Sequence, residues 1–178
     1  MKSILLISLF VLSGRFAPTT FKPEDQGSSV QFTIRNLGFK VNGSFSGLDG
    51  KIQFDPNDLA ASSFDVTVDA NTVNTDNTMR DEHLRKESYF DIKNYPRIRF
   101  LSTHITSSGK NGGFIVSGKL TIKNQTKDIS FPFSASLSNE KYLFKGTFKI
   151  NRKDFDIGGS STISDELEVN LNILADKV

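Results

Sequence analysis

Apolar and polar residues alternate with a period of two along most of the chain. This alternation is typical of β-strands that bury one face and expose the other. The apolar positions fall into nine runs, at residues 30–34, 39–45, 52–54, 64–68, 98–100, 114–122, 129–137, 144–150 and 167–173. Turn-forming sequences separate several runs, for example "GLDG" at 47–50, "SGKNGG" at 108–113 and "KNQTK" at 123–127. The pattern therefore predicts an all-β chain of about nine short strands, in either a closed antiparallel barrel or a sandwich.

Phenylalanine dominates the predicted apolar face. The chain contains 16 Phe and no Trp. The Phe residues on the apolar parity are Phe32, Phe39, Phe45, Phe54, Phe64, Phe100, Phe114, Phe131, Phe133, Phe144 and Phe148. The same face includes Gly43, Gly118 and Gly146, and glycine inside a strand often marks a bend or the close approach of another group. A barrel of about eight strands either just fills its interior or holds one small ligand, so a filled core and a hollow both remain open.

One short segment departs from this pattern by its density of charge. Residues 79–91, "MRDEHLRKESYFD", are expected to begin with a short amphipathic helix, for which Thr78 is a candidate N-cap. Two acid-first i,i+4 pairs would face water, namely Asp81 with Arg85 and Glu82 with Lys86. The opposite face would carry Met79, Arg80, His83, Leu84 and Glu87.

Three interpretations of this segment are considered. It could be a lid over a barrel mouth, with Arg80 and His83 directed at the polar head of an apolar ligand. It could be a solvated helix in which Arg80 pairs only with a neighbouring carboxylate and His83 bonds the backbone. It could hold a metal through His83, Glu87 and His104, but this set is an incomplete ligand shell. Catalysis is poorly supported, because the sequence pairs no nucleophile with a base.

Composition excludes several classes of function. Lys and Arg number 22 against 20 Asp and Glu, a net charge of +2 that gives no sign of nucleic-acid binding. The chain has no Cys, so disulfides, thiolate catalysis and cysteine-ligated zinc are excluded. A length of 178 residues is typical of one domain.

The N-terminus, "MKSILLISLFVLSGRFAP", has the character of an export signal. Lys2 precedes an apolar run at 4–12 that is too short to span a bilayer but suits a signal peptide. A buried first strand is the competing interpretation. We expect a signal peptide at residues 1–17 and a domain at residues 18–178, which would be periplasmic or secreted. No other segment could span a membrane.

Four ordered motifs resemble one known family. They are "SSVQFTIRNLGFKVNGSFSGLDGKIQFDPNDL" (28–59), "RDEHLRKESYFDIKNYPRIRF" (80–100), "GKLTIKNQTKDISFPF" (118–133) and "NRKDFDIG" (151–158). From about residue 21 to its end, the chain resembles the YceI-like family of exported bacterial proteins that bind polyisoprenoid lipids. Asn124 and Asp156 stand where many members have Gly, so those two turns are expected to differ.

The resemblance implies a fold and a site. The fold would be a lipocalin-like antiparallel β-barrel of about eight strands with one or two short helices. Its hydrophobic tunnel would hold a polyisoprenoid or similar long-chain lipid, for carriage or storage, without catalysis, metal or cofactor. The residues expected to contact the ligand are Phe32, Phe39, Phe45, Phe64, Arg80, His83, Leu84, Phe90, Phe100, Phe114, Phe131, Phe133 and Phe148.

Two other functions are kept beside lipid binding. The first is an enzyme that acts on an isoprenoid-type lipid with His83 as the general base. The second is a stress-response interaction module with a filled core. A homodimer is also compatible with the sequence.

Overall fold

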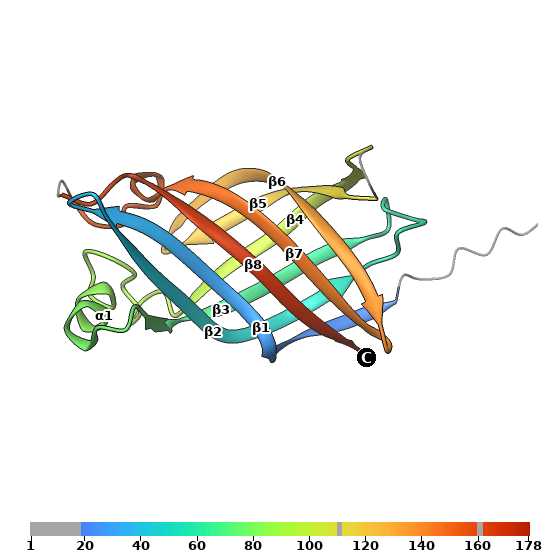
Figure 1. Ribbon diagram of the computed structural model, residues 1–178, viewed down its shortest axis with the longest axis horizontal. Helices are drawn as coiled ribbons and strands as arrows, with labels where there is room; N and C mark the ends of the chain where they lie inside the picture. Colours follow the sequence, from blue (N-terminus) through green and yellow to red (C-terminus); the bar gives the residue numbers. More distant parts are fainter. Residues whose placement is uncertain (1–18, 110–111, 160–161) are drawn as a thin grey trace, which may run out of the picture.

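The protein is a closed barrel of eight antiparallel strands (Figure 1). The computed structural model describes residues 19–109, 112–159 and 162–178. Each strand pairs with the next, and the last pairs with the first. The strands are β1 (Thr20–Asn36), β2 (Phe39–Gln53), β3 (Ser63–Asn74), β4 (Arg97–Ser107), β5 (Phe114–Ile122), β6 (Gln125–Ser138), β7 (Lys141–Asn151) and β8 (Glu166–Lys177). The lipocalin-like barrel that the resemblance implied is therefore confirmed.

Two short helical elements connect strands at one end of the barrel. The α-helix α1 (Thr78–Leu84) lies between β3 and β4, and the 3-10 turn η1 (Arg152–Phe155) lies between β7 and β8. Within the described parts of the chain, no helix is long and apolar enough to cross a membrane. The signal peptide expected at residues 1–17 lies outside the described residues.

The expectation of nine short strands was wrong at one place. The runs at 39–45 and 52–54 belong to the single long strand β2, and "GLDG" is an irregularity within that strand instead of a turn. Gly47 and Gly50 have φ angles of 69° and 129°, which glycine adopts without a Cβ penalty. The carboxylate of Asp25 accepts hydrogen bonds from the backbone N–H groups of Gly47 and Leu48, at 3.0 and 2.9 Å. The strand therefore bends at this point without ending.

The connections between strands define two different ends of the barrel. We call the mouth the end that carries the β1–β2 turn at residues 37–38, helix α1, the β5–β6 turn at residues 123–124 and η1 (Figure 1). We call the closed end the end that carries the β2–β3, β4–β5 and β6–β7 connections. At the mouth, Asp156 has a φ of 53°, the left-handed conformation that favours glycine, so this turn keeps a glycine-like backbone with an Asp side chain.

Aromatic rings fill the closed end. Phe54 is only 2% exposed and lies at the centre of this cluster. Its ring packs against those of Phe64, Phe114, Phe133, Tyr142 and Phe144, with centroid distances of 5.2 to 6.2 Å. Burial, assisted by the nearby charge of Asp55, raises the pKa of Tyr142. These rings form an apolar plug that seals one end of the barrel.

Candidate functional site

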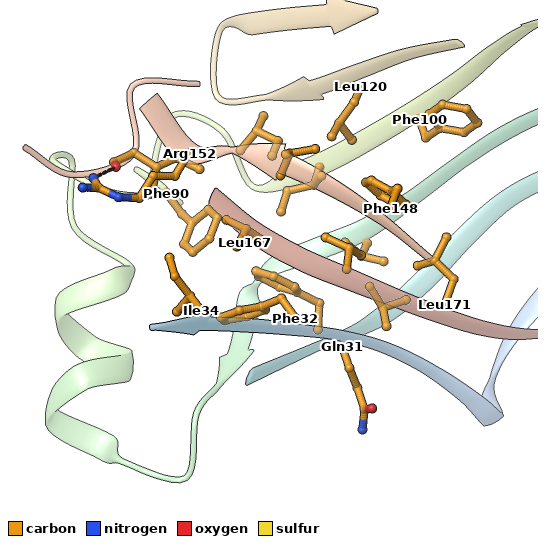
Figure 2. A pocket seen from close by; sticks show the side chains of 18 of the residues that line it. Gln31, Phe32, Ile34, Phe90, Phe100, Leu120, Phe148, Arg152, Leu167 and Leu171 are labelled. Atoms are coloured by element: carbon orange, nitrogen blue, oxygen red, sulfur yellow. Dashed lines mark hydrogen bonds between the residues drawn. The ribbon is translucent and has the colours of Figure 1, made fainter. Parts of the chain in front are cut away.

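The interior between the plug and the mouth is a cavity of about 640 Å³. Its lining runs from the plug rings Phe64 and Phe133 to Met79, an exposed residue at the mouth, so the cavity reaches the surface there. Figure 2 shows inward side chains from several strands, including Phe32, Leu167 and Phe148, around this space. The volume lies within the range of pockets that bind small molecules.

Glycine residues on the inner face help to keep this space open. Phe32 pairs with Gly43 across β1 and β2, and its ring lies where a Cβ of residue 43 would be, only 2.2 Å from that position. Similarly, the ring of Phe131 lies 3.2 Å from the Cβ position of Gly146. A ring that covers a glycine can lie flat against the wall instead of extending into the lumen. The mixture of rings and glycines in the sequence thus builds a hollow.

Most of the residues expected to contact a ligand line this cavity. They are Phe32, Phe45, Phe64, Arg80, His83, Leu84, Phe90, Phe100, Phe131, Phe133 and Phe148. The fold therefore brings the segment around α1 and the inner faces of the strands, which are far apart in the sequence, to the same cavity. Whether each of these residues binds a ligand remains a prediction.

Two of the expected residues lie elsewhere, and their assignment to the wall was wrong. Phe39 is 77% exposed, because it directly follows the β1–β2 turn and projects beyond the last wall position on β2, Val41. Phe114 begins β5 at the closed end and packs into the plug, 5.2 Å from the ring of Phe54. For Phe39 and Phe114, the alternation gave the face of the strand but not the height along the barrel.

Helix α1 forms at the mouth, but its contacts differ from the predicted ones. The N-cap is Asn77 and not Thr78, and its side-chain oxygen accepts a hydrogen bond from the backbone N–H of Arg80 at 3.0 Å. Asp81 is only 7% exposed instead of facing water. It accepts hydrogen bonds from the backbone N–H and the hydroxyl of Thr75, at 2.9 and 2.5 Å.

The predicted i,i+4 ion pairs are likewise wrong. Among the ion pairs of the described residues, none joins 81 to 85 or 82 to 86. Arg85 instead donates hydrogen bonds to the carbonyl oxygens of Asn71 and Val73, at 2.9 and 3.1 Å. The helix is therefore fixed to the end of β3 by hydrogen bonds that no sequence-local rule indicates.

Arg80 is held at the edge of the cavity by Thr75. Its Nε donates to the Thr75 hydroxyl at 2.7 Å, and its Nη2 donates to the Thr75 carbonyl at 2.6 Å. Within the described chain, no ion pair joins Arg80 to Asp81 or Glu87, which were its expected partners in a purely structural role. The His83 ring packs edge-on against the ring of Tyr89, with centroids 4.9 Å apart. Both polar side chains thus lie at the mouth.

The sequence did not single out several features of the site. The wall also contains aliphatic side chains, including Ile34, Val41 and Leu167, although the same alternation predicts their inward direction. Arg152 was missed as well. It is 3% exposed, and its guanidinium donates to the carbonyl oxygens of Ile157, Gly158, Gly159, Ile163 and Ser164. The motif "NRKDFDIG" was the available signal, because it places an arginine at the end of a strand.

The electrostatic character of the lining is neutral to basic. Its charged residues are Arg80, Lys145 and Arg152, and among the described lining residues there is no carboxylate. Arg152 is largely neutralised by Asp165, 3.1 Å away. A hydrogen bond from Lys153, and more weakly the charge of Arg152, lowers the pKa of Asp165. The wall suits an apolar chain, and the mouth suits a head group that accepts hydrogen bonds.

The metal interpretation gains no geometric support. An irregularity in β4 shifts the register between Ser102 and His104, so Ile105 is buried and His104 is exposed. The expectation that His104 shares the inward parity of Phe100 was therefore wrong. In the described ranges, no three His, Asp or Glu side chains gather in a way that could hold a metal ion.

A closed antiparallel barrel of eight strands with one sealed end and an apolar interior is a lipocalin-like binding barrel. A family model of the YceI-like domain matches residues 21–175. The chain belongs to the YceI-like family.

Individual relatives agree with this assignment. A UPF0312 protein of Vibrio cholerae is 34% identical over 152 residues, which cover 80% of each chain. The crystal structure of Burkholderia cenocepacia BcnA matches with a TM-score of 0.80 at 25% identity, over 85% of this chain and 98% of that one. A polyisoprenoid binding domain from Saccharophagus degradans, implicated in plant cell wall breakdown, matches with a TM-score of 0.72 at 15% identity, over 90% and 99% of the two chains.

Proposed function

We propose that the protein binds a polyisoprenoid or similar long-chain amphiphile in its barrel and carries or stores it without catalysis. The observation that supports this most strongly is the cavity of about 640 Å³, which is walled by phenylalanine and aliphatic side chains and sealed at one end. A chain that enters at the mouth would lie along the wall with its end toward the plug. Its polar head would stay beside Arg80 and His83.

The affinity would come mainly from the burial of hydrocarbon. Removal of apolar surface from water contributes about 25 cal/mol per Å², less the cost of ordering the chain. Affinity should therefore rise with chain length until the cavity is filled. The Saccharophagus degradans structure, described as a polyisoprenoid binding domain, supports the class of ligand at the level of shared fold.

The cavity offers little for the alternative of catalysis. A general base needs a partner that orients it, and His83 contacts the ring of Tyr89. The described lining residues include no Asp or Glu that could serve as such a partner. A binding role needs neither a cofactor nor a metal. A filled-core interaction module is also disfavoured, because the barrel interior is hollow.

The binding role is tested by narrowing the cavity. Gly146 lies on the inner face of β7 beneath the ring of Phe131, so Gly146→Leu would push that ring toward the lumen and narrow the cavity. The matched control is Thr147→Leu, the next residue along β7, which is exposed. Prenols of increasing length are titrated into wild type and both variants. We expect a loss of at least about tenfold for Gly146→Leu with the longest chain, and little change for Thr147→Leu. Wild type that binds no prenol of any length would refute the proposed function.

We also propose that the protein is exported, on the basis of the apolar run that follows Lys2. Mass spectrometry of the native protein should show a mature chain that begins near residue 18. A native chain that begins at Met1 would contradict export. The same sample, extracted with organic solvent, would identify the lipid that is bound in the cell.

A further inference from the structure

We propose that the rim of the mouth, formed by the β1–β2 turn and the start of α1, docks on the surface of an anionic lipid bilayer. This inference rests on the proposed function, because a carrier of long-chain lipid has to collect or deliver its ligand at a membrane. It adds the place where that exchange occurs and the residues that make the contact.

Three large apolar side chains are exposed at the mouth. Leu37, in the β1–β2 turn, and Phe39, directly after it, are 68% and 77% exposed, and Met79 in α1 is 79% exposed. Figure 1 shows that the turn and α1 lie at the same end of the barrel, where the cavity opens. Of the three, Met79 also lines the cavity, so exposed apolar surface adjoins the cavity opening at α1. Exposed apolar side chains gathered beside a binding site commonly mark an interaction surface.

The local chemistry of the turn gives an independent argument. Leu37 has a φ of 50° and Gly38 a φ of 84°, so the turn needs two residues in the left-handed region. Asn-Gly or Asp-Gly is the favoured sequence for such a two-residue hairpin. A bulky apolar residue is unfavourable at the first position both for the backbone and for exposure to water. The folded chain uses the backbone N–H of Leu37, which donates to the carbonyl oxygen of Thr162 at 3.0 Å, but it leaves the side chain 68% exposed. A role for that side chain outside the folded chain is therefore favoured.

The charged residues of the hairpin indicate which kind of lipid surface the rim would bind. The chain carries no Asp or Glu from residue 26 to residue 48, the stretch that forms both arms of the hairpin. It does carry Arg35 and Lys40, which pair across β1 and β2 directly behind the turn and are both exposed. Acidic side chains lie on the neighbouring elements, namely Asp76 and Glu82 on the α1 side and Glu166 and Glu168 at the start of β8, so the basic pair belongs to the hairpin itself. Apolar tips backed by basic side chains suit an anionic bilayer, where the tips enter the interface and the cations meet lipid head groups.

The test measures flotation of the whole protein with vesicles of phosphatidylcholine, with and without phosphatidylglycerol. The double variant Leu37→Asn, Phe39→Ser removes the apolar tips and installs the favoured turn sequence, so it should fold at least as well as wild type. We expect it to bind anionic vesicles about tenfold more weakly. We expect Lys40→Gln to bind about fivefold more weakly. The matched control is Leu137→Ser, which removes an exposed leucine at the closed end and should bind as wild type does.

The outcomes separate docking from ligand binding. If wild type binds prenols in solution but floats with neither kind of vesicle, docking is refuted and the proposed function stands. If wild type floats but binds no prenol, the proposed function fails and docking stands. Equal flotation of wild type and the double variant would refute the assignment of the rim. Equal binding to vesicles with and without phosphatidylglycerol would refute the anionic surface.

Discussion

At the scale of single residues, the cavity depends on which side chain faces which across the sheet. Phe32 lies over Gly43, and Phe131 lies over Gly146, so the rings rest on places that have no side chain. In both places the ring takes up space that a side chain on the neighbouring strand would otherwise occupy. The number of Phe residues alone would fit a solid core equally well.

The polar residues at the mouth give a prediction at this scale. His83→Ala should weaken the binding of a prenol more than the binding of the matching headless hydrocarbon, because His83 and Arg80 lie beside the expected head position. The difference should be about fivefold, the size of one net hydrogen bond. Affinity is measured for both ligands at equal chain length in wild type and variant. Equal losses, or none, would mean that the segment is only scaffolding.

At the scale of elements, α1 is held by hydrogen bonds to residues outside the helix instead of by ion pairs within it. The seven-residue helix is too short to be stable alone. Asp81 fixes Thr75, and Thr75 in turn fixes Arg80, so the helix and the end of β3 form one hydrogen-bonded unit. The unit positions Arg80 at the cavity edge.

Loss of the central carboxylate should loosen this unit. Asp81→Ala would leave the buried backbone N–H and hydroxyl of Thr75 without their acceptor. We therefore expect this variant to lower the free energy of unfolding by about 1–3 kcal/mol. Glu82→Ala, an exposed neighbour in the same helix, is the control and should change stability by less than about 0.5 kcal/mol. Urea unfolding measures both variants. A similar small effect for the two would show that Asp81 is not structurally important.

At the scale of the whole molecule, closure joins β1 to β8 and leaves no free sheet edge. Ion pairs on the outer surface lie across several of these strand pairs. Asp65 on β3 accepts two hydrogen bonds from Arg99 on β4, at 2.8 and 2.7 Å. Asp176 on β8 lies 2.6 Å from Lys141 on β7. Such pairs are exposed and individually contribute little to stability.

The combined contribution of these ion pairs should be visible as a loss of stability at acidic pH. Hydrogen bonds from Arg99 and Lys141 lower the pKa of Asp65 and Asp176, respectively, below the ordinary value of 3.8. A carboxyl group whose pKa is lower in the folded state stabilises the fold fully above its unfolded pKa, and this contribution is lost as the pH falls through the folded pKa. The urea midpoint should thus be steady near neutral pH and decrease below about pH 4. Arg99→Gln should reduce this decrease, and an unchanged acid slope in that variant would contradict the assignment.

A large part of the fold could be predicted from the sequence, but with specific errors. The alternation gave the inward face of nearly every strand and most of the cavity wall, because strand geometry places every second side chain on one side. It failed where the backbone departs from that geometry. The irregularity in β2 joined two predicted strands, and the register shift beside Thr103 turned His104 outward. Such irregularities depend on the partner strand, which a local pattern does not contain.

The sequence by itself determined the all-β class, the family and the apolar face, because these follow from local alternation and from motifs within continuous segments. Only the tertiary structure decided that the interior is hollow, since this depends on pairing glycines with rings on other strands. It also decided that Phe114 belongs to the plug and Phe39 to the rim, because the height of a residue in a barrel is set by strand length and register. The burial of Asp81 was decided in the same way, by a Thr75 that helix periodicity does not predict as its partner.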